Sequence, residues 1–153
     1  MMKSEVKIES GSLQIVRVFG APRTRVFRWW AEAERLRQWS GCKEARNCEV
    51  EMDFRVGGTF TQRMEISGKG QFTVTGTYEE ILEPERIVYR ANLGPVATRV
   101  TVEFLVEGHG TKVVLTQDGL PDEMMRNIVA MGTTESLDKL EALIGVPAAA
   151  ERV

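Results

Sequence analysis

The sequence is poor in histidine and cysteine, two residues that often carry out acid–base, nucleophilic or metal chemistry. It contains one histidine, His109, which lies between two glycines in a predicted hairpin, with no acid or nucleophile beside it. A solvent-exposed turn residue is the favoured interpretation, so histidine-dependent catalysis is not expected. Cys42 and Cys48 could form a small disulfide loop or half of a metal site. Two independent reduced thiols are favoured, because cytosolic thiols stay reduced and a metal site would need further ligands.

Strong net charge and long apolar runs are also missing. The net charge is -2 and the charged residues are interspersed, so no nucleic-acid or anionic-membrane surface is indicated. No apolar run reaches the roughly 20 residues of a membrane-spanning helix, and residues 1–12 are too polar for a signal peptide. These absences favour a cytoplasmic protein that neither binds nucleic acid nor inserts into a membrane. The length predicts one domain over residues 1–153, with a core at about 12–145 and a loose tail at 146–153.

Residues 121–144 carry the only apolar periodicity of helix length. Pro121 suits the first helical position, and Asp122 and Glu123 place negative charge in the first turn, where the helix dipole favours it. Gly145, followed shortly by a proline, is a stop signal. We expect this helix to be the longest in the protein.

The apolar stripe of this helix changes direction at Gly132 and Thr133. Before that point it consists of Met124, Met125, Ile128, Val129 and Met131, and after it of Leu137, Leu140, Leu143 and Ile144. The leucine-rich end is expected to close a solid core. Methionine is flexible and suits adaptable binding surfaces, so the methionine-rich start is expected to line a cavity.

The remainder of the chain predicts an α+β fold. Two short helices are expected at 23–31 and 33–39, the first burying Val26, Phe27 and Trp30. The neighbouring Trp29 then points elsewhere and is expected to be partly exposed, bordering a cavity mouth or a partner surface. Alternating segments joined by short turns predict a curved antiparallel sheet of about seven strands, with its apolar face covered by the last helix. These strands are expected at 13–19, 48–54, 59–66, 72–78, 87–92, 100–106 and 113–115.

A series of short motifs resembles a known family. The motifs are Ala21-Pro22-Arg23, Val26-Phe27, Trp30, Glu34-Arg35-Leu36, Trp39, residues 53–60, 76–81, 84–89, 110–111 and 119–123, Gly132, and residues 136–140. In this order, over about residues 12–144, they resemble the activator of heat-shock-protein-90 ATPase homologue-like family. That family belongs to the START-related, polyketide-cyclase-like helix-grip superfamily, and the resemblance implies a cavity between the sheet and the last helix. Many relatives have a tryptophan after this glycine where the present chain has Thr133, which implies a roomier and more polar site.

Gln62, Tyr78, Tyr89 and Gln117 are the few polar residues predicted on the apolar face of the sheet. Each is either a core residue with a backbone partner or one of the sparse polar groups that orient an apolar ligand. With them, the residues expected to line the ligand cavity are Trp30, Phe60, Gln62, Met64, Phe72, Val74, Tyr78, Tyr89, Gln117, Met124, Ile128, Met131 and Thr133.

The favoured function is a small-molecule binding protein that holds an apolar or aromatic ligand in this cavity. The resemblance implies a second hypothesis, a chaperone-interacting protein with a role in the stress response. A third is a cyclase-like or hydrolase-like enzyme in which cavity Tyr, Gln or Arg residues polarise a carbonyl. The sequence contains no evident acid–base constellation, so no catalytic residue, cofactor or metal is assigned, and both a monomer and a homodimer remain open.

Overall fold

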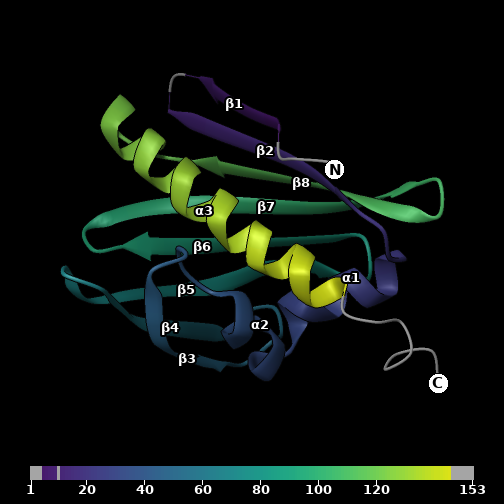
Figure 1. The fold of residues 1–153 in the computed structure, drawn as a ribbon, viewed down its shortest axis with the longest axis horizontal. Coiled ribbons are helices and arrows are strands. Elements are labelled where there is room, and N and C mark those ends of the chain that lie inside the picture. The colour runs from purple at the N-terminus through teal and green to yellow at the C-terminus, as the bar shows by residue number, and fades with distance from the viewer. Residues whose placement is uncertain (1–4, 10, 146–153) are drawn as a thin grey trace.

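The computed structural model describes residues 5–9 and 11–145. Within this part, a single antiparallel sheet has the strand order β1-β2-β8-β7-β6-β5-β4-β3. The sheet is strongly curved, and α3 crosses its concave face obliquely (Figure 1). The elements are β1 (Glu5–Glu9), β2 (Ser12–Phe19), α1 (Arg23–Ala31), α2 (Ala33–Trp39), β3 (Ala45–Met52), β4 (Thr59–Ile66), β5 (Gly70–Leu82), β6 (Arg86–Leu93), β7 (Val96–Glu107), β8 (Gly110–Asp118) and α3 (Glu123–Ile144).

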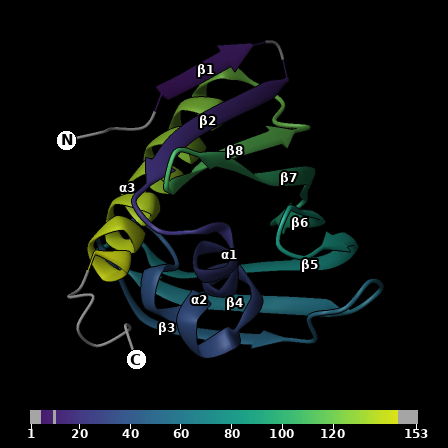
Figure 2. The same ribbon diagram turned by 90° about the vertical axis from the view of Figure 1, so that its right-hand side faces the viewer.

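The strands wrap around the interior from β1 and β2 on one side to β3 on the other. Figure 2 looks along this curve and shows α3 on the open side of the sheet, with α1 and α2 between its two flanks. Alternating residues of β2, β7 and β8 are buried because the concave face points at the helices. The α+β helix-grip arrangement expected from the sequence is therefore confirmed.

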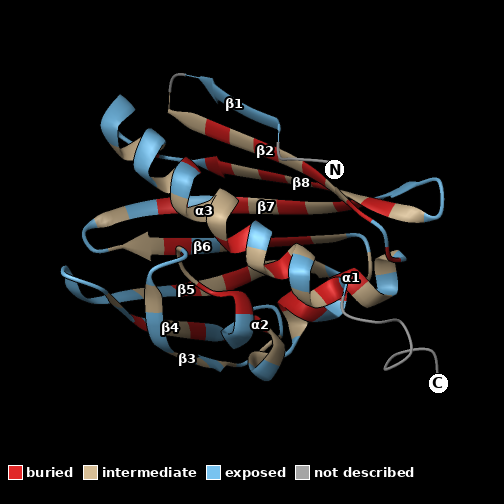
Figure 3. Cartoon of the chain, in the orientation of Figure 1, coloured by how far each residue is buried: buried red, intermediate tan, exposed pale blue. Residues whose placement is uncertain are grey.

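A solid core fills one end of the interior. The ring centroids of Phe27 and Phe104 lie 5.2 Å apart, and those of Trp30 and Phe104 lie 5.1 Å apart. Leu137 and Leu140, from the second half of α3, are fully buried in the same cluster. Figure 3 shows this contrast along α3, whose first half is mainly exposed. The leucine-rich end of α3 thus closes the core as expected.

Helix α3 is held at its start by a cap and along its second half by ion pairs. Asp122 is the N-cap, and its carboxylate accepts a hydrogen bond from the Met125 amide. Pro121 therefore precedes the cap, whereas the sequence predicted it at the first helical position. Further along, the buried Arg17 of β2 donates to Asp138 at 2.6 Å and to Glu141 at 3.2 Å. These contacts fasten the second half of α3 to the sheet.

The sheet has eight described strands, one more than the sequence predicted. The additional strand, β1, is an edge strand whose side chains are all exposed, so it lacks the alternation that marks a half-buried strand. It pairs with the first half of β2, and the ordered sheet therefore begins before residue 12. Strand β3 covers Ala45–Met52 and not the predicted 48–54. The predicted loose tail at 146–153 lies outside the described residues.

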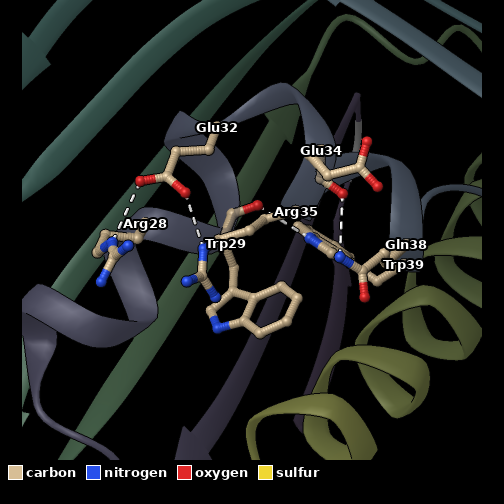
Figure 4. A network of polar contacts seen from close by, with 7 residues as sticks. All are labelled: Arg28, Trp29, Glu32, Glu34, Arg35, Gln38 and Trp39. Carbon is tan, nitrogen blue, oxygen red and sulfur yellow. Dashed lines mark hydrogen bonds and ion pairs between the residues drawn. The ribbon is translucent and has the colours of Figure 1, made fainter. Parts of the chain in front are cut away.

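The prediction that Trp29 is partly exposed is wrong. Its side chain is 5% exposed, and the Arg35 guanidinium of α2 lies 4.9 Å from the ring centroid. The backbone oxygen of Trp29 also accepts a hydrogen bond from Trp39, and Glu32 binds both Arg28 and Arg35 (Figure 4). Helical periodicity describes each helix separately. It therefore did not show that α2 packs over the outer face of α1 and buries Trp29.

Candidate functional site: a cavity under the first half of the last helix

A cavity of about 1090 Å³ lies between the first half of α3 and the concave face of the sheet. Along this half, three apolar side chains that line the cavity are left uncovered: Met124 is 72% exposed, Ile128 58% and Met131 60%. Helix α3 packs on β2 and α2. Side-chain contacts that hold it there, such as those of Asp138 and Lys139, lie in its second half. The cavity is therefore open to solvent beside the start of α3.

An aromatic wall forms part of the sheet side of the cavity. The ring centroid of Phe60 lies 5.4 Å from that of Tyr78 and 5.4 Å from that of Tyr89, and the two tyrosine rings are 6.1 Å apart. Gly76 makes this packing possible, because a Cβ atom there would lie only 2.4 Å from the Phe60 ring and 2.0 Å from the Arg90 carbonyl oxygen. The wall presents a largely apolar surface with two phenolic hydroxyls.

The structure brings all the residues predicted for the cavity around this one space. They come from six elements: Trp30 from α1; Phe60, Gln62 and Met64 from β4; Phe72, Val74 and Tyr78 from β5; Tyr89 from β6; Gln117 from β8; and Met124, Ile128, Met131 and Thr133 from α3. Of these, Phe72 lies toward the outside, with 56% of its side chain exposed, whereas Trp30, Phe60 and Tyr78 are buried. Contact of these residues with a ligand stays a prediction.

The comparisons with known proteins agree with this fold. A family model described as Activator of Hsp90 ATPase homolog 1-like protein matches residues 20–145. The chain belongs to this family. No curated protein matches it.

Solved structures show how widely this fold is shared. A protein from Rhizobium leguminosarum is 31% identical, with a TM-score of 0.74 over 96% of this chain and 99% of that one. Protein CV1439 from Chromobacterium violaceum is 25% identical, with a TM-score of 0.78 over 88% of this chain and 96% of that one. CalU16 from Micromonospora echinospora is 20% identical, with a TM-score of 0.68 over 99% of this chain and 88% of that one, a likeness that shows the fold alone.

In this member of the activator of Hsp90 ATPase homolog 1-like family, the interior polar groups of the cavity are uncharged. The Tyr78 and Tyr89 hydroxyls are uncharged at neutral pH, and burial raises the pKa of both further above it. Neither hydroxyl makes a hydrogen bond to another described residue. Gln117 is 6% exposed, and its amide nitrogen donates to the Thr98 hydroxyl at 3.0 Å. The polar interior can therefore form hydrogen bonds with a guest without offering it a charge.

Charged lining residues lie at the mouth of the cavity, where water screens them. Lys43, Glu44, Lys69 and Asp122 are exposed, and Glu135 is half-buried. His109 is an exposed turn residue, as predicted, and Cys42 and Cys48 form no disulfide. Among residues 5–9 and 11–145, no group of His, Cys, Asp or Glu side chains could hold a metal ion, and no helix is long and apolar enough to cross a membrane.

Sequence reasoning missed one wall of the cavity, the loop between α2 and β3. Gly41 and Cys42 of this loop line the space. Two residues of α3 hold the loop in place: Ser136 donates to the Gly41 carbonyl at 2.5 Å, and Lys139 donates to the Cys42 carbonyl at 3.2 Å. No local pattern marks such a loop. The prediction also left out four strand residues that line the cavity: Ile87, Ala91, Val100 and Leu115. The alternation of the strands could have identified them, because they share a face with predicted lining residues.

Proposed function

We propose that this chain binds an apolar small molecule in the cavity between the sheet and α3. The observation that best supports this proposal is that the first half of α3 has exposed apolar side chains, which face a space and not a packed core. Ligand pockets of proteins typically span roughly 300–1,000 Å³, and this cavity, at about 1090 Å³, slightly exceeds that range. A bound molecule would cover apolar surface that water now contacts, which is the main source of affinity in such sites.

The composition of the lining supports a guest of variable shape. Met124, Met125 and Met131 of α3 border the cavity, and methionine adapts its shape at little cost because its side chain is unbranched and polarisable. The opposite wall is the rigid aromatic group around Phe60. One adaptable wall facing one rigid aromatic wall favours aromatic or other flat apolar molecules.

The test uses the uncharged fluorescent dye Prodan, which has no hydrogen-bond donor. We expect saturable binding with one dye per chain, and weaker binding in Met131→Glu, because the change removes an apolar side chain from the cavity lining and places a solvated charge beside it. Val106→Glu is the matched control: Val106 is 66% exposed, much like Met131, but does not line the cavity. Equal affinities of the two variants, or no saturable binding by the wild type, would contradict the proposal.

The family description favours a second candidate, interaction with an Hsp90-type chaperone. In that case the protein would raise the ATPase rate of the chaperone in a concentration-dependent way. If Met131→Glu abolished dye binding but left this stimulation unchanged, the two functions would use different surfaces. An ATPase rate that does not respond to the protein would remove this candidate.

A further inference from the structure

We propose that the ligand is an uncharged apolar molecule with a hydroxyl group, which donates its hydrogen to Oε1 of Gln117 on the floor of the cavity. This inference rests on the proposed binding function and adds the chemical class of the ligand. It follows from three features of the site: the position of Gln117, the orientation of its amide, and the absence of charge around it among the described residues.

The position is set by a row of residues that runs straight across the sheet. Tyr78 pairs with Tyr89, Tyr89 with Val100, and Val100 with Gln117. All four residues line the cavity. Neighbouring strands are about 4.8 Å apart, so Gln117 and Tyr89 lie roughly 10 Å apart on the backbone, with only the small Val100 between them. Gln117 therefore borders the cavity two strands away from Tyr89, with the short side chain of Val100 between them.

The orientation of the Gln117 amide follows from its neighbours. The Thr98 hydroxyl donates its one hydrogen to the Ala91 carbonyl at 2.8 Å. Its oxygen can therefore only accept from Gln117, so the group 3.0 Å away must be the amide nitrogen. These two hydrogen bonds direct the amide nitrogen of Gln117 toward Thr98 and its oxygen, Oε1, away from it. Oε1 makes no hydrogen bond to any described residue. A buried side chain thus offers a fixed and unpaired acceptor to the cavity.

An unpaired acceptor selects for a donor on the ligand. Leaving such a group without a partner when a ligand excludes water costs about 1–3 kcal/mol, so a molecule that supplies a donor is favoured. The charged lining residues lie at the mouth, as described above, and a carboxylate or ammonium group beside Gln117 would have no opposite charge nearby. Oxygen atoms elsewhere on the ligand can instead accept from the hydroxyl of Tyr89 or Tyr78.

The experiment compares three competitors of bound Prodan: 2-naphthol, its methyl ether 2-methoxynaphthalene, and the anionic 2-naphthoate. Wild-type protein is expected to bind 2-naphthol about tenfold more tightly than the ether, and 2-naphthoate more weakly than either. Gln117→Leu should bind 2-naphthol and its ether equally, each affinity being corrected for the affinity of that variant for Prodan. Thr98→Val, which frees the amide to rotate, should reduce the preference without removing Gln117.

Gln14→Leu is the matched control, because Gln14 also donates to a threonine hydroxyl, at 3.4 Å, but lies outside the cavity lining. It should keep the full preference for 2-naphthol. Absence of Prodan binding would overturn the proposed function itself. If Prodan binds, the inference alone is overturned by equal affinities of wild type for 2-naphthol and its ether, by a preference that persists in Gln117→Leu, or by tightest binding of 2-naphthoate.

Discussion

Replacing Gly132 by tryptophan adds the largest side chain at a point where the structure leaves room for it. Gly132 lies in the middle of α3 and lines the cavity, and a Cβ atom built there meets nothing within 4 Å. Its backbone oxygen accepts a hydrogen bond from Ser136, and this bond does not depend on the side chain at position 132. The new indole should therefore enter the cavity while the helix stays intact.

The expected change in stability combines three terms. If the indole buries about 100 Å² in this open site, burial contributes about 2.5 kcal/mol. Removing a glycine from a helix interior adds about 0.5 kcal/mol, and fixing the indole costs about 1 kcal/mol. The free energy of unfolding should rise by about 2 kcal/mol, which corresponds to a Tm increase of about 4–8 °C for a domain of this size.

Thermal melts and Prodan titrations of Gly132→Trp and Gly132→Ala test this expectation. Gly132→Ala should be more stable than the wild type by about 1 kcal/mol, because alanine is a better helix former than glycine. Its small side chain fills almost none of the cavity, so the dye affinity of this variant should equal that of the wild type. The tryptophan variant should melt at the highest temperature and bind the dye at least tenfold more weakly. A lower Tm for Gly132→Trp than for the wild type, or equal dye affinity of the two variants, would refute the placement of Gly132 at an open cavity.

Three further predictions concern stability. The chain has only two tyrosines, and burial raises the pKa of both, so the folded protein should show no tyrosinate absorbance near pH 10. Stability should fall as the pH rises above about 10, because the unfolded state then loses protons that the folded state retains; tyrosinate that appears before unfolding would contradict this. Combining Asp138→Asn with Glu141→Gln should cost about 2 kcal/mol in urea unfolding, because it takes two carboxylates from the buried Arg17; an unchanged urea midpoint would contradict this. Asp122→Ala should cost about 1 kcal/mol by removing the cap of α3, and an unchanged Tm would argue against that cap.

The elements that sequence reasoning placed correctly are those with a strong local period. Helices α1 and α2 have the predicted bounds, and the inward faces of the strands that line the cavity follow from alternation. The edge strand β1 was missed because both of its faces are exposed, so burial imposes no alternation on it. The part of the cavity wall that the strands form could be predicted for the same reason that the sheet could: residues on one face of a curved sheet point to one interior.

By itself, the sequence determined the order of the elements from β2 to α3, the inward faces of the strands, and the change of direction of the apolar stripe of α3 at Gly132, because these depend on spacing along a few helical turns or strand residues. Only the tertiary structure decided what lies opposite each face. The contact that places Gly41 beside Ser136 joins residues 95 positions apart, and the one that orients Gln117 depends on the pairing of β7 with β8. Such contacts leave no period in the sequence. They turn the methionine-rich start of α3 into one wall of a cavity, and its leucine-rich end into the cover of a core.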